Sequence, residues 1–144
     1  MTTAASSFTS TPTAQAIALL RVTSGVLLLT HGLTKLLVFT PAGTVGFFES
    51  IGFPGFLAYP VMAGEIVLGL ALIVGFMTRW AALAALPIMI GAIIPHAANG
   101  YSFSNPGGGW EYPVFLVVIS AVVALQAAPA RQKTTLGSAA PTLA

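Results

Sequence analysis

Residues 57–76 read LAYPVMAGEIVLGLALIVGF, and this stretch decides the fold. It contains a single charged side chain, Glu65, among residues that are almost all apolar. A helix that crosses the hydrocarbon core of a membrane needs about 20 such residues in succession. The stretch therefore predicts a transmembrane helix that carries one carboxyl group at membrane depth.

The composition of the whole chain supports a membrane setting. Of 144 residues, 56% are hydrophobic, and only 6% are Asp, Glu, Lys or Arg. A soluble domain carries roughly 25% charged residues, because it must cover its surface with polar groups. Lipid does not penalise exposed apolar side chains. We therefore predict one integral membrane domain, with the lipid bilayer as its solvent.

Three more apolar segments have a suitable length, at 14–39, 80–96 and 112–128. With 57–76 they predict an all-α, integral membrane four-helix bundle over residues 14–128. Small and polar residues dominate 1–13 and 129–144, which predicts disordered tails. Between the helices, the phenylalanines near 47–53 indicate a short amphipathic piece in the interface. The segment 97–111 indicates an exposed loop with Tyr101, Phe103 and Trp110 as aromatic anchors at headgroup level, and Tyr112 is a further interface anchor.

The positions of Lys and Arg predict the orientation of the bundle. If the N-terminus is cytoplasmic, four basic residues lie on or near the inner side, and one, Lys35, lies toward the outside. The four are Arg21, Arg79, Arg131 and Lys133. The positive-inside rule then favours N-in and C-in.

The other ionisable groups fall in one half of the membrane when the helices are placed by depth. They come from all four predicted helices: His31, Lys35, Glu65, His96 and Glu111. His31 and Lys35 are four residues apart, and an α-helix would place them on one face. An isolated charge at the centre of a membrane helix costs about 2.5–3.5 kcal/mol. Glu65 therefore needs a partner, and we expect Lys35, with both histidines nearby.

Each of these residues also has a purely structural interpretation. Glu65 is as well explained by an ion pair between helices as by a functional role. Lys35 is of a type that snorkels to headgroups. A histidine at a helix end, such as His96, is easily solvated, and Glu111 suits a helix N-terminus. Arg21 and Arg79 are explained by a topological or a structural role.

Several classes of function are disfavoured. The chain has no cysteine, which removes thiol chemistry and thiolate metal sites. No His lies at helical spacing from another His or Glu, so we predict no metal site. A net charge of +2 without a basic cluster argues against nucleic acid as a partner. No nucleotide-binding motif is present.

Five short blocks occur in an order that resembles the DoxX family of small four-helix bacterial membrane proteins. They are LTHGLTKL at 29–36, FFESIGFP at 47–54, GE at 64–65, GFMTR at 75–79 and EYP at 111–113. The resemblance extends over about residues 18–125. The positions that match the family pattern are Arg21, His31, Gly32, Lys35, Glu65, Arg79, His96, Glu111 and Tyr112.

The resemblance implies location in the inner membrane and a role in a membrane oxidoreductase system. One branch of the family resembles the small subunit of a thiosulfate:quinone oxidoreductase. Another is linked to complexes with a sulfurtransferase and a superoxide dismutase. The family offers no established catalytic assignment, so the resemblance leaves open whether the chain is itself an enzyme.

The sequence leaves two functions in competition. One is a redox-associated subunit that binds a quinone or similar lipid-soluble carrier between helices, next to redox enzyme subunits. His31, Glu65 or Lys35 would then hydrogen-bond its carbonyl groups. The other is a non-enzymatic scaffold that assembles or localises partner proteins. Polar groups in only one membrane half argue against a transport path, and the oligomeric state stays open.

Overall fold

Every element of the chain between residues 12 and 127, the part that this computed structural model describes, is helical or a connection between helices. The long helices are α1 (Pro12–Leu33), α3 (Ala58–Val74), α4 (Thr78–Ala97) and α5 (Glu111–Gln126). The shorter ones are a π-helix, η1 (Thr34–Val38), then α2 (Thr40–Ser50) and a 3-10 turn, η2 (Gly55–Leu57). The predicted all-α membrane fold is confirmed.

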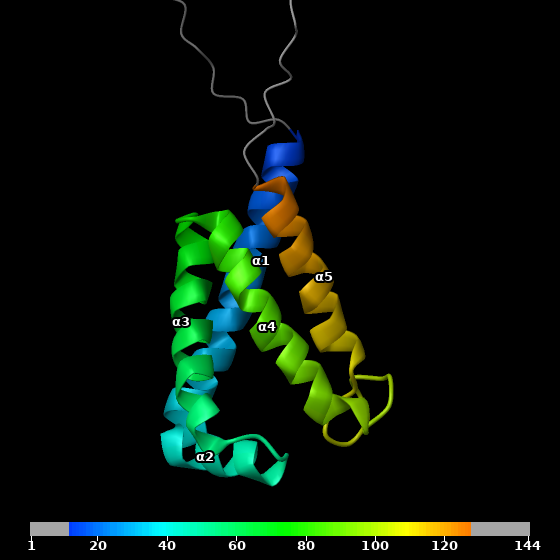
Figure 1. Ribbon diagram of the computed structural model, residues 1–144. Helices are drawn as coiled ribbons and strands as arrows, with labels where there is room; N and C mark the ends of the chain where they lie inside the picture. Colours follow the sequence, from blue (N-terminus) through cyan, green and yellow to red (C-terminus); the bar gives the residue numbers. More distant parts are fainter. Residues whose placement is uncertain (1–11, 128–144) are drawn as a thin grey trace, which may run out of the picture.

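The four long helices run alternately up and down, as Figure 1 shows. The start of α1, the end of α5 and the α3–α4 hairpin lie at one end of the bundle, and α2 and the α4–α5 loop lie at the other. Three segments are long and apolar enough to cross a membrane: Pro12–Val38, Gly55–Val74 and Thr78–Ala97. The apolar helix α5 is shorter, with 16 residues.

The helix boundaries lie close to those predicted. The helix α1 begins at Pro12, inside the predicted tail, because the fixed φ of proline suits the first turn of a helix. The predicted segment 14–39 divides, since its last turn is π-helical and α2 begins at Thr40. The remainder of both predicted tails, the end of the fourth segment at 128, and the basic residues 131 and 133 lie outside the described residues.

Helices α1 and α3 form the closest pair in the bundle. A Cβ atom added to Gly25 would lie 2.7 Å from the carbonyl oxygen of Gly69, and one added to Gly69 would lie 2.7 Å from the amide nitrogen of Leu29. The two backbones approach this closely only because both positions lack a side chain. Small residues serve this purpose in membrane helix pairs, where dispersion contacts replace the hydrophobic effect.

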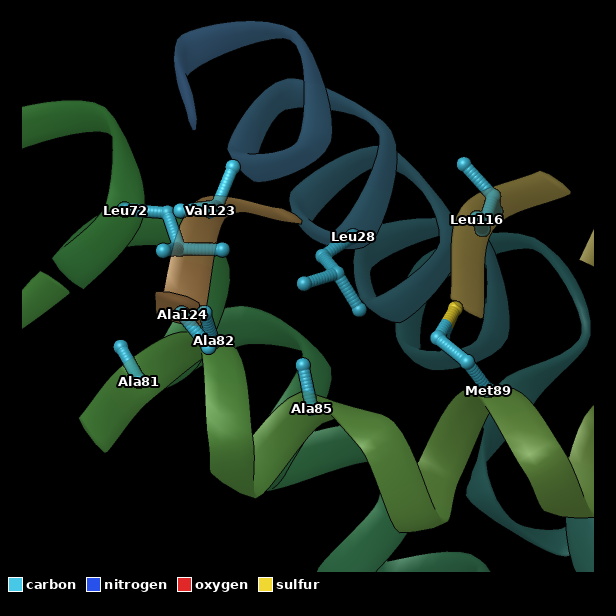
Figure 2. Packing of buried hydrophobic residues seen from close by; sticks show 9 residues of the cluster. All are labelled: Leu28, Leu72, Ala81, Ala82, Ala85, Met89, Leu116, Val123 and Ala124. Carbon is cyan, nitrogen blue, oxygen red and sulfur yellow. The ribbon is translucent and has the colours of Figure 1, made fainter. Parts of the chain in front are cut away.

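The buried core lies where all four long helices meet, toward the end of the α3–α4 hairpin (Figure 2). Alanines of α4 let that helix approach α5 closely, and Leu72 and Val123 are almost completely enclosed. The whole cluster is Leu28, Leu72, Ala81, Ala82, Ala85, Met89, Leu116, Val123 and Ala124. No charged residue belongs to it. Arg21 and Arg79 lie near the hairpin, whereas His96 and Glu111 lie at the opposite end, where α4 and α5 diverge from α1 and α3 (Figure 1).

Candidate functional site

A buried ion pair connects α1 to α3 through the π-helical segment η1. The Lys35 ammonium donates hydrogen bonds to both carboxylate oxygens of Glu65, with Nζ–Oε1 and Nζ–Oε2 distances of 2.6 and 2.8 Å. Glu65 is only 3% exposed. The predicted pairing of these residues is thus present, and it satisfies the carboxylate that the sequence places at membrane depth.

Local features of the sequence create room for this pair. A Cβ added to Gly32 would lie 3.0 Å from the Cβ of Glu65, so glycine lets α1 approach α3 beside the carboxylate. The Lys35 carbonyl oxygen accepts a hydrogen bond from the buried hydroxyl of Thr44 in α2, at 3.2 Å. Lys35 therefore connects to α3 through its side chain and to α2 through its backbone. Short π-helical segments of this kind are frequent at functional sites.

His31 lies one turn before Lys35 but faces α5. Its ring centroid is 6.2 Å from that of Tyr112, with an angle of 42° between the ring planes. Within residues 12–127, neither imidazole nitrogen has a hydrogen-bond partner in the structure. His31 and Lys35 were expected on one face of the helix, but their side chains contact different helices. Because α1 packs against both α3 and α5, Lys35 reaches Glu65 of α3 and His31 reaches Tyr112 of α5.

His96 and Glu111 do not join the ion pair, contrary to the expected single cluster. The Nδ1–H of His96 donates to the carbonyl oxygen of Gly107 at 2.9 Å. The Glu111 Oε1 atom accepts the backbone N–H of Phe103 at 2.5 Å. Both partners belong to the α4–α5 loop. The two groups share one end of the bundle with the ion pair, but in the described chain their polar contacts fasten the loop.

An open groove of about 870 Å³ lies between His31 on α1 and the first turns of α5. Its walls are mostly apolar and rich in aromatic rings. The lining residues are His31, Tyr101, Phe103, Trp110, Glu111, Tyr112, Val114, Phe115 and Val118. The sequence predicted Trp110 and Tyr112 only as interface anchors. Tyr101 and Phe103 were likewise expected only as aromatic anchors of the exposed loop, and their place in the wall of a groove was not predicted.

The rings in the groove contact one another in pairs. Tyr101 meets Trp110 edge to face, with centroids 5.1 Å apart and planes at 81°. Phe103 meets Tyr112 at 6.1 Å and 57°. Such tilted arrangements add to the stability of an aromatic cluster beyond its buried area. The result is a wall of paired rings with the imidazole of His31 beside Tyr112.

Arg21, expected to have a topological or structural role, makes a structural contact whose partners the sequence did not predict. Its Nη1 group donates to the carbonyl oxygens of Leu72 and Ile73, the second at 3.1 Å. These carbonyls belong to the last turn of α3, which ends at Gly75 in a left-handed conformation. A cation at a helix C-terminus satisfies orphan carbonyls and opposes the helix dipole. Arg79 instead stacks over Trp80, with its guanidinium carbon 5.7 Å from the ring centroid.

Metal ligands do not gather in the described part of the chain. No group of three or more His, Cys, Asp or Glu residues there is close enough to hold a metal ion. The chemistry that the arrangement offers is therefore of two kinds. The ion pair holds charge inside the bundle, and the groove presents one imidazole to an open, mostly apolar space lined by aromatic rings.

The fold and these sites define a small multi-pass membrane protein with an aromatic groove. A family model described as DoxX matches residues 16–98, and the chain belongs to the DoxX family. The match covers α1 to α4, so the loop and α5, which supply most of the groove, lie beyond it.

One relative is a protein of Bacillus subtilis (strain 168) named "Putative oxidoreductase CatD". It is 41% identical over 76 residues, which are 53% of this chain and 55% of that protein. The comparison thus spans just over half the length of each. No solved structure matches the chain.

Proposed function

We propose that this protein is a quinone-binding subunit of a redox system in the cytoplasmic membrane, with the N- and C-termini inside. The observation that carries the proposal is the exposed imidazole of His31, which has no hydrogen-bond partner among residues 12–127, in an open groove walled by aromatic rings. The relative named as an oxidoreductase, and the family that the chain belongs to, support the redox setting.

A quinone head group has the chemistry that this groove suits. It is a planar ring with two carbonyl oxygens that accept hydrogen bonds, and its tail is apolar. Pockets for such ligands are mostly hydrophobic, with a few polar groups that fix orientation. The rings of Trp110 and Tyr112 offer faces and edges for stacking, and His31 can donate an N–H to one carbonyl. Because the groove is open, the tail can remain in lipid.

Protons and electrons reach a quinone by separate routes. A bound quinone would carry two electrons and two protons between membrane enzymes. The imidazole of His31 is of a type that exchanges protons near neutral pH. The chain has no cysteine and no nucleotide-binding motif, so we expect a partner redox subunit to supply the electrons. In this proposal the Lys35–Glu65 pair holds the helices that frame His31.

Tryptophan fluorescence tests the proposal, because the chain has two tryptophans at opposite ends of the bundle. The substitution Trp80→Phe leaves Trp110 in the groove wall as the reporter. Titration of this variant in lipid nanodiscs with decylubiquinone should quench its emission saturably. Adding His31→Ala should weaken binding by about tenfold, the effect of one lost hydrogen bond.

The matched control is Trp110→Phe, which keeps only Trp80. Its quenching should rise linearly with quinone, as for simple partition into lipid. Linear quenching of Trp110 as well, or equal affinity with and without His31, would contradict the proposed site.

A further inference from the structure

The α4–α5 loop is fastened directly to the start of α5. The backbone N–H of Trp110 donates to Gly100 O at 3.1 Å, and that of Glu111 donates to Tyr101 O at 3.2 Å. The Glu111 side chain returns the contact by accepting the N–H of Phe103 at 2.5 Å. Residues 100–103 and 110–111 thus form a short clamp, in which Glu111 supplies both a donor and an acceptor.

The clamp places two aromatic rings on the groove. Tyr101 and Phe103 both line it, and each contacts a ring of the α5 side, Trp110 and Tyr112 respectively. A loop without fixed backbone contacts would let these rings sample many positions. The Glu111 carboxylate accepts the backbone N–H of Phe103, whose ring lines the groove, so this contact bears directly on the groove wall.

Gly109 makes the clamp sterically feasible. It is buried, and a Cβ atom added there would collide with the backbone of Tyr101 and Ser102. The loop therefore lies directly on the Gly109 backbone. Any side chain at this position must displace the segment that carries the two rings.

The other half of the loop has contacts of its own, and one backbone hydrogen bond, from Asn105 N–H to Ser102 O at 3.0 Å, joins it to the ring-bearing half. His96 and Asn99 both donate to the carbonyl oxygen of Gly107, and Asn105 donates to Asn99 O at 2.7 Å. These side-chain contacts do not involve residues 100–103. Loss of the Glu111 side-chain contact should therefore loosen Phe103, while the backbone hydrogen bonds to Gly100 and Tyr101 and the rest of the loop remain.

From these contacts we infer that Glu111 is a positioning residue for ring recognition. By holding Phe103 and Tyr101 in place, it gives the groove its preference for a planar ring over an acyl chain. The inference rests on the proposed quinone site and adds that the α4–α5 loop determines which ligands bind. A tail-less quinone, bound through its ring alone, should depend on Glu111 more than a tailed one does.

The test compares menadione, which has no long tail, with decylubiquinone by Trp110 quenching in the Trp80→Phe background. Glu111→Ala should weaken menadione binding by about tenfold, and decylubiquinone binding by less, because its tail still partitions into lipid. Glu111→Gln should restore most of the affinity, since the amide oxygen can still accept the Phe103 N–H. Hydrogen exchange at Phe103 should be faster in the alanine variant than in the glutamine variant.

A second substitution, Gly109→Ala, displaces the same loop without removing a polar side chain. Gly109→Ala should weaken menadione binding like Glu111→Ala, whereas Gly91→Ala, which meets nothing within 4 Å, should not. Glu49→Ala removes an exposed carboxylate from α2 at the same end of the bundle and should also leave binding unchanged. Circular dichroism of each variant establishes that the helices remain.

The possible results separate the two proposals. If the parent protein shows no saturable quenching with either quinone, the proposed site and this inference both fail. Saturable binding with equal affinities in the parent, Glu111→Ala and Gly109→Ala would overturn the positioning role alone. An equal loss in Glu111→Ala and Glu111→Gln would show that the charge acts, rather than the hydrogen bond to the loop.

Discussion

At the scale of single residues, the Lys35–Glu65 pair is a balance between attraction and the cost of burial. A buried ion pair often contributes little net stability relative to apolar residues of similar size. Removing one partner, in contrast, leaves an uncompensated charge and is strongly destabilising. The pair therefore makes the bundle sensitive to single substitutions at two positions without making it especially stable.

This balance predicts the outcome of a double-mutant cycle. Lys35→Met should lower the free energy of unfolding by about 3–5 kcal/mol, because Glu65 then stays buried without a partner. The double variant Lys35→Met/Glu65→Leu should recover most of that loss. Unfolding by sodium dodecyl sulfate in mixed micelles, followed by circular dichroism, measures both. A double variant as unstable as the single one would contradict the structural role of the pair.

Residue types alone predicted this pair, but not how the other polar groups divide. Glu65 needed a partner, and Lys35 was the cation expected in the same half of the membrane. The energetic cost of an isolated charge at membrane depth was enough to predict the pair. The division of His31 from Lys35 depends on which neighbour each side of α1 faces. The hydropathy pattern predicts how deep a residue lies in the membrane, but not which neighbouring helix its side chain faces. The partners of Arg21 were not predicted for a similar reason, since its contact with the end of α3 depends on how the helices pack.

At the scale of elements, the α1–α3 contact depends on glycines that face each other. The Cβ of an alanine at Gly25 would lie 2.7 Å from Gly69 O and 2.9 Å from the Ile73 amide nitrogen, both backbone atoms. Backbone atoms of a packed helix cannot move aside as a flexible side chain can. Overpacking of this kind costs typically 1–3 kcal/mol.

Gly25→Ala should therefore destabilise the bundle by about 1–3 kcal/mol, despite the better helix propensity of alanine. Gly91→Ala in α4, where nothing lies within 4 Å of the added atom, should leave stability unchanged or raise it slightly. The same micelle unfolding assay compares them. Equal stabilities of the two variants would show that α1 and α3 do not pack this closely.

Hydropathy predicted the long helices well because length and apolar content decide whether a segment can span lipid. It gave no sign of the π-helix at Thr34–Val38, because no residue pattern separates π from α geometry there. The helix α2 was expected only as a short amphipathic piece. Its full extent from Thr40 to Ser50 depends on contacts such as that of Thr44 with Lys35, which belong to tertiary structure.

At the scale of the whole molecule, the start of α1 and the end of α5 lie at the same end of the bundle (Figure 1). The orientation of the protein therefore depends only on which side of the membrane this end faces. The positive-inside rule predicts that the α3–α4 hairpin with Arg79 faces the cytoplasm and the α4–α5 loop faces outward. The chain has no cysteine, so a single introduced one is a clean reporter. Ser104 in the loop and Phe76 in the hairpin are both exposed.

We expect Ser104→Cys to react with a membrane-impermeant maleimide in intact spheroplasts, and Phe76→Cys only after the membrane is permeabilised. Mass-tag shifts on a gel measure both variants in the same preparation. The reverse pattern would place the groove at the cytoplasmic side and would overturn the predicted N-in, C-in topology.

The short length of α5 has a consequence for the lipid around it. Its 16 residues extend about 24 Å, less than the roughly 30 Å thickness of the hydrocarbon layer. Pro12–Val38, with 27 residues, is longer than that layer and must tilt to fit. A hydrophobic mismatch of this sign thins the bilayer locally. The membrane should therefore be thinnest on the flank where the groove opens, so that headgroups and water come closest to the imidazole there.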